Sequence, residues 1–135
     1  MADMNYNKLV AQILGIVLVL IGILGFFTSP ILGIFAVNTL HNIIHLLTGG
    51  ILLVGAYMAG GRNARMTNMV LGFVYLLVAL VGFLNVESIN HLVGNGANDG
   101  GVVIADAVLH ALLAVVLLVV SFAMKQDTMM SKPAM

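Results

Sequence analysis

Two pairs of ionisable side chains lie within otherwise apolar stretches of the chain. His41 and His45 are four residues apart, and so are Asp106 and His110. On an α-helix, residues four apart lie on one face, one turn from each other. Each pair can therefore direct two ligands or proton carriers the same way. Such groups are costly inside a membrane and normally face the interior of a bundle, where they serve a function.

These side chains allow three kinds of site, and the sequence leaves the choice open. As a buried hydrogen-bond network, Asp106 would accept from His41 or His110 and tie the helices together. As a transport site, the histidines would carry protons or a small solute, because histidine titrates near neutral pH. As a metal site, three imidazoles and one carboxylate fit Zn²⁺, Cu²⁺, Fe²⁺ or Mn²⁺. The ligands of that transition metal would be His41, His45, Asp106 and His110.

A tetrapyrrole is a further alternative for the cofactor. His45 and His110 would then be the axial ligands of a haem, or either one would bind another tetrapyrrole alone. His91 lies in a polar connection, where we expect it to be solvated. The sequence has no Ser–His or metalloprotease motif, so we do not expect an enzyme.

The composition indicates an integral membrane protein. Of the 135 residues, 61% are hydrophobic and only 7% are charged, whereas soluble domains carry about 25% charged residues. Apolar runs close to the ~20 residues of a membrane-spanning helix cover residues 9–27, 40–60, 69–85 and 102–124. The sequence therefore predicts an all-α, integral membrane four-helix bundle. It forms one four-span domain over residues 1–127, with a disordered tail over 128–135.

Charge and cysteine content narrow the partners and the orientation. There is no cysteine for a disulfide or a thiolate ligand, and zero net charge without a basic cluster argues against nucleic acid. The basic residues precede the first run, separate the second from the third, or follow the fourth: Lys8, Arg62, Arg65, Lys125 and Lys132. By the positive-inside rule, both termini are cytoplasmic. The ionisable pairs then lie towards the outer face.

The chain also reads as a tandem repeat of two-helix hairpins, over about 9–60 and 66–124. Gly15 matches Gly72 at an offset of 57 residues (72 − 15), and His45 matches His110 at an offset of 65 (110 − 45). A pseudo-two-fold axis along the membrane normal would bring both ionisable pairs together. Small residues on the first and third runs would let helix backbones approach closely. The Gly-rich segment 94–101 is predicted to be a flexible connection, and the apolar segment 31–37 to lie in the interface or dip into the protein.

Two motifs resemble those of a known family. The first is His41-Asn42-x-x-His45-Leu46-x-x-Gly49, and the second is Asp106-x-x-x-His110. They resemble a bacterial family of small four-span membrane proteins that is described only as a domain of unknown function, and the resemblance covers about residues 9–124. Ala107 departs from the pattern, which more often has Asn there. The resemblance implies a multi-pass protein of a bacterial inner membrane and no particular reaction.

Together these observations predict a small membrane protein with a structural or accessory role. Its partners would be the lipid bilayer and a larger membrane complex or a second copy of the chain. The alternatives are a protein that binds a metal or tetrapyrrole through the His/Asp cluster, and a transporter of protons or a small solute.

Overall fold

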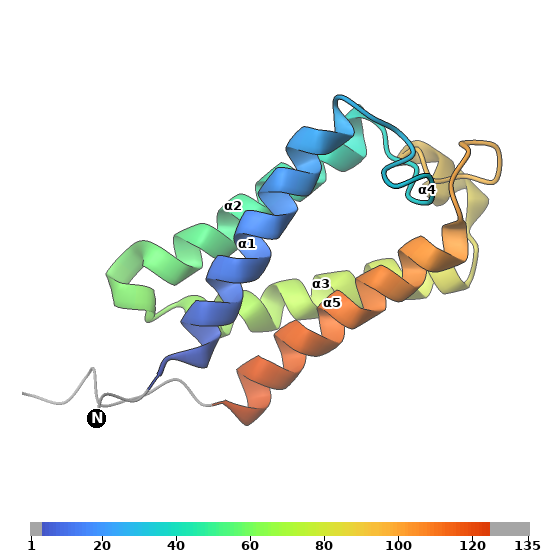
Figure 1. Cartoon of the computed structure of the whole chain (residues 1–135). Coiled ribbons are helices and arrows are strands. Elements are labelled where there is room, and N and C mark those ends of the chain that lie inside the picture. Colours follow the sequence, from blue (N-terminus) through green and yellow to red (C-terminus); the bar gives the residue numbers. More distant parts are fainter. Residues whose placement is uncertain (1–3, 125–135) are drawn as a thin grey trace, which may run out of the picture.

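The continuous apolar runs form long helices in a computed structural model, which describes residues 4–124 (Figure 1). The elements are α1 (Tyr6–Gly25), α2 (Thr39–Tyr57), the 3₁₀ helix η1 (Met58–Gly61), α3 (Ala64–Phe83), α4 (Glu87–Leu92) and α5 (Val103–Ala123). In this described part, four helices are long and apolar enough to cross a membrane, namely α1, α2 with η1, α3 and α5. The predicted all-α membrane bundle is confirmed. The predicted tail lies outside the described residues.

Polar side chains cap the beginnings of α1 and α2. Asn5 precedes α1, and its Oδ1 accepts a hydrogen bond from the Lys8 backbone N–H (3.0 Å). Asn38 does the same for α2, accepting from the His41 N–H (3.0 Å). Helix α3 begins five residues before the predicted apolar run, because Asn68 is buried inside the helix. Its Nδ2 donates to the backbone oxygen of Asn7 (3.0 Å), which joins α3 to α1.

The long helices pack as two hairpins, α1 with α2 and α3 with α5 (Figure 1). Glycine permits the close approach within each hairpin. A Cβ on Gly15 would lie 2.8 Å from Leu53 Cγ, and a Cβ on Gly72 would lie 2.8 Å from Leu118 Cγ. These two contacts are related by the offsets of the predicted repeat, 57 for the glycines and 65 for the leucines. The tandem repeat stays a prediction, which the equivalent contacts support.

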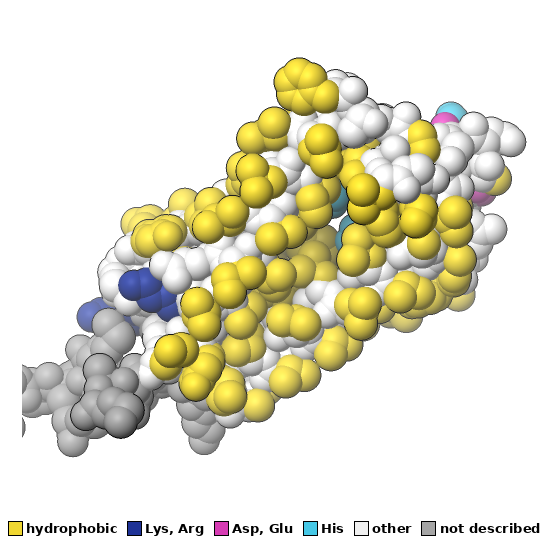
Figure 2. Space-filling view, viewed as in Figure 1, with side chains coloured by type: hydrophobic (Ala, Val, Ile, Leu, Met, Phe, Trp, Pro, Cys, Tyr) yellow, Lys and Arg dark blue, Asp and Glu magenta, His cyan; other side chains and the backbone are white. Residues whose placement is uncertain are grey.

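The two hairpins meet near η1 and diverge towards the opposite end, where the long connections lie (Figure 1). Leu52 of α2 and Leu117 of α5 are completely buried in the core between them. Most other large apolar side chains lie on the outside of the bundle (Figure 2), as expected for helices that face lipid. The wedge between the diverging hairpins is where polar side chains gather.

The connections at the open end fold back against the helices. The segment after α3 forms α4 and then returns, so Asn95 is only 2% exposed and its Nδ2 donates to Asp106 Oδ2. The flexibility expected of the segment 94–101 stays a prediction. The segment 31–37 dips into the protein, one of its two predicted positions. Its Ala36 is completely buried, and Ile34 O accepts a hydrogen bond from the Val102 N–H (2.7 Å).

Candidate metal site between the hairpins

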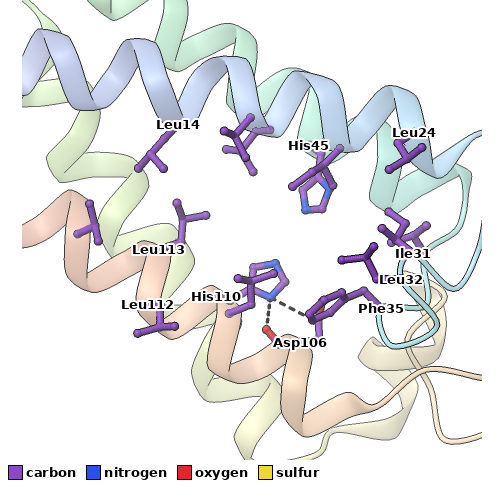
Figure 3. A pocket seen from close by; sticks show the side chains of 16 residues that line it. Leu14, Leu24, Ile31, Leu32, Phe35, His45, Asp106, His110, Leu112 and Leu113 are labelled. Carbon is purple, nitrogen blue, oxygen red and sulfur yellow. Dashed lines mark hydrogen bonds and ion pairs between the residues drawn. The ribbon is translucent and has the colours of Figure 1, made fainter.

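Three imidazoles converge in the wedge between the hairpins. His41 and His45 come from α2 and His110 comes from α5; their ring centroids are 4.5, 6.0 and 6.2 Å apart. Each ring offers one nitrogen that lies within 4.8 Å of the other two. All three residues are buried, with at most 7% of their surface exposed. Figure 3 shows His45 and His110 pointing towards each other from facing sides of a cavity. The structure thus brings together three of the four predicted ligands.

Hydrogen bonds fix two of these rings in one orientation. His41 Nδ1 donates to the backbone oxygen of Val93 (3.2 Å). His110 Nδ1 donates to the backbone oxygen of Asp106 (2.8 Å). Since a carbonyl oxygen can only accept, both rings carry their proton on Nδ1, and Nε2 keeps its lone pair when the ring is neutral. Histidines that bind metals are oriented in this way by an acceptor behind the ring.

Asp106 lies behind His110, outside the group of three converging nitrogens. Its Oδ2 is 3.1 Å from His110 Nδ1 and accepts a hydrogen bond from Asn95 Nδ2 (3.1 Å). The carboxylate can therefore position and polarise His110 from this place. Asn95 belongs to the folded-back connection, and its role was not predicted. The available signal was only that a buried carboxylate needs hydrogen-bond donors.

His45 differs from the other two histidines. Its Nδ1 is buried and has no hydrogen-bond partner among the described residues. A buried polar atom without a partner is uncommon and calls for an explanation such as a bound ion. The neighbouring Asn42 side chain lies against Gly25, where a Cβ would clash with its amide. This packing holds the first turns of α2 close to α1.

Tyr75 of α3 completes the cluster and was not predicted. Its ring stacks on His110, with centroids 5.7 Å apart and planes 14° apart. Its hydroxyl is 2.7 Å from Thr48 Oγ1, so α3 is bonded to α2 beside the site. The sequence feature that could have indicated the role of Tyr75 is that it is the one tyrosine in the apolar run 69–85. His91 lies apart from the cluster: its side chain is 71% exposed and its Nδ1 donates to Asp99 Oδ2 (3.2 Å).

Two cavities flank the three histidines. The larger, about 530 Å³, lies between α1 and α5, and the smaller, about 220 Å³, lies between α2 and α3. Both are lined by His45, Asp106 and His110. The site is therefore reached from both interfaces between the hairpins.

The ring positions argue against the tetrapyrrole. A haem bound by His45 and His110 would occupy the space around the midpoint between their rings. The centroid of His41 is 4.5 Å from His45 and 6.0 Å from His110, so His41 stands beside that midpoint. The macrocycle and the His41 ring would compete for the same space.

The fold and the cluster define a small multi-pass membrane protein with a buried site of three histidines. The family model for a domain of unknown function (DUF4383) matches residues 8–123. The chain belongs to this family, which confirms the resemblance found in the sequence. Comparison with the curated proteins gives no match, and comparison with the solved structures gives none either.

Proposed function

We propose that this protein binds a transition metal ion, with zinc as the first candidate, through His41, His45 and His110. The convergence of three buried ring nitrogens within 4.8 Å carries this proposal. Zinc–nitrogen bonds are about 2.0–2.1 Å long, so a small inward rotation of the side chains would bring all three nitrogens to one ion. The orientation of His41 and His110 by oxygen acceptors also supports it.

The site would have an open coordination position. Structural zinc sites have four protein ligands, whereas three protein ligands leave a place for water or another molecule. Asp106 would act behind His110, where its charge also offsets that of the ion. This differs from the four-ligand arrangement predicted from the sequence only in the place given to Asp106.

The site would face the outer side of a bacterial inner membrane, with both termini in the cytoplasm. Figure 2 shows lysine and arginine atoms at the end of the bundle opposite the histidines. The cations of the described part are Lys8 in the first turn of α1, Arg62 directly after η1 and Arg65 in the first turn of α3. Their segregation supports this orientation by the positive-inside rule.

A structural or accessory role is the second candidate. The hydrogen bonds of Asp106 with Asn95 and of Tyr75 with Thr48 favour it, because they would hold the bundle together without an ion. The protein would then act within a larger membrane assembly. Transport has less support, because the described core along α2 and α5 is apolar at the completely buried Leu52 and Leu117.

Elemental analysis of detergent-purified protein tests the proposal. We expect about one zinc per wild-type chain after zinc loading and dialysis, and its loss in His45→Ala/His110→Ala. His91→Ala is the matched control, because His91 is exposed and outside the cluster. Circular dichroism of each variant would show that the helices remain. A wild-type protein without metal, or a double variant that retains it, would refute the proposal and leave the structural role.

A further inference from the structure

The larger cavity is an apolar chamber with polar groups at one place. It is lined by 16 residues, of which His45, Asp106 and His110 are the ionisable ones. The other walls are apolar side chains of α1, α5 and the segment 31–37 (Figure 3). Along α1 it extends from Leu14 to Leu24, about 15 Å at 1.5 Å per residue. This shape suits a molecule with a long apolar part and one polar end.

The chamber opens on the surface that faces lipid. Val17 of α1 and Val116 of α5 line it, and both remain more than 40% exposed. In Figure 2, histidine atoms are visible at the bottom of a hollow on this face. A lipid-soluble molecule could therefore reach the histidines sideways from the bilayer, without crossing the loops.

The opposite side of the site has the smaller cavity, about 220 Å³. The smaller cavity is lined by residues equivalent to those of the larger one in the predicted repeat, such as Val78 in place of Ile21. Tyr75 stands there where the larger cavity has Leu18, and stacks on His110. The returning connection adds Val93 and Asn95 to its wall. Of these two cavities in the described part, the one between α1 and α5 is the larger and offers more room for an apolar chain.

Charge balance indicates the polar end of the ligand. A Zn²⁺ ion bound by three neutral imidazoles carries two positive charges, and Asp106 supplies one negative charge. Asp106 is the one carboxylate within the four long helices, all of which the structure describes. One positive charge would therefore remain in an apolar environment, which is costly. A singly charged anion at the open coordination position would neutralise it.

We propose that the chamber binds a single-chain anionic amphiphile, a long-chain carboxylate, with its head on the metal and its chain between α1 and α5. This inference rests on the proposed metal site for the position of the head. The chamber has a volume of about 530 Å³, which lies within the ordinary range of ligand cavities, about 300–1,000 Å³.

Titration of zinc-loaded protein in detergent with oleate tests this inference, with zinc measured in the same samples. Val17→Trp/Val116→Trp would fill the chamber from two exposed side chains that line it. Ile16→Trp/Val115→Trp is the matched control, because these neighbours are also exposed and do not line the chamber. We expect one oleate per wild-type or control chain, and an affinity lower by about tenfold or more in the chamber variant. Both variants should keep their zinc.

The outcomes separate this inference from the metal proposal. Equal oleate binding by wild type, control and chamber variant, or no binding by zinc-loaded protein, would overturn the chamber proposal whatever the zinc content. If the protein takes up no zinc on loading but still binds oleate in a way that the chamber variant weakens, the result would support the chamber and overturn the metal proposal. Oleyl alcohol, which lacks the charge, should bind at least about tenfold more weakly than oleate. Equal binding of both would overturn the carboxylate head and indicate a neutral amphiphile.

Discussion

Replacement of Asp106 by asparagine tests how the carboxylate acts on the site. The change removes one negative charge and keeps the size of the side chain. Loss of a group that orients a metal-binding histidine typically costs about 10–100-fold in metal affinity. The backbone oxygen of Asp106, which accepts from His110 Nδ1 at 2.8 Å, remains in the variant. The ring therefore keeps one acceptor, and we expect a loss near the lower limit, about tenfold or 1.4 kcal/mol.

The variant should fold, because the polar groups around it can be paired again. If the new amide oxygen takes the place of Asp106 Oδ2, it can accept from Asn95 Nδ2 and from His110 Nδ1, as Oδ2 does in the wild type. Buried polar groups that remain paired cost little stability.

Competition against a fluorescent zinc chelator would measure the affinity of Asp106→Asn. Asp99→Asn is the matched control, because Asp99 pairs with the exposed His91 outside the site. An unchanged affinity would refute the argument that Asp106 acts on the ion. Complete loss of zinc would also refute it, because Asp106 would then be a direct ligand, as the sequence first suggested.

Three further predictions concern stability and can be read from thermal unfolding in detergent. Gly72→Leu should destabilise the protein by about 1–3 kcal/mol, because a Cβ there would lie 2.8 Å from Leu118 Cγ; Gly50→Leu, with nothing within 4 Å, should not. Tyr75→Phe should cost about 0.6 kcal/mol, since it loses the hydroxyl contact with Thr48 and keeps the stacking on His110. Zinc at about 100 times its Kd should stabilise wild type by about 2.7 kcal/mol. A chelator should reverse this gain, and His45→Ala/His110→Ala should not show it.

The four long helices could be predicted because each is a continuous apolar run of membrane-spanning length. Their ends were less accurate, and the reason is local. Helix α3 starts at Ala64 instead of near residue 69, because the polar Asn68 lies inside the helix and donates to Asn7 of α1, a contact that hydropathy does not reveal. The short α4 was missed because four of its six residues are polar and it carries no membrane signal.

The histidines could be predicted to lie together for two reasons. The i, i+4 spacing puts each pair on one helix face, and the repeat offset puts the two pairs at equivalent positions of the two hairpins. The rest of the site depends on contacts between distant segments. Asn95 reaches Asp106 only because the connection after α4 folds back over the helices. Tyr75 stacks on His110 only because α3 and α5 pack closely in one hairpin. Neither contact follows from the spacing of residues along one element.

The differences between the two hairpins explain how a nearly symmetric bundle would hold an asymmetric site. In the predicted repeat, His41 corresponds to Asp106 and His45 to His110. Histidine at all four positions would favour a closed site of four imidazoles, with no coordination position for another molecule. The carboxylate at 106 instead leaves three imidazoles and one balancing charge. Tyr75 corresponds to Leu18, and the cavity on its α2–α3 side is about 220 Å³, against about 530 Å³ on the α1–α5 side. Two exchanges between equivalent positions would thus provide both the open coordination position and the larger apolar chamber beside it.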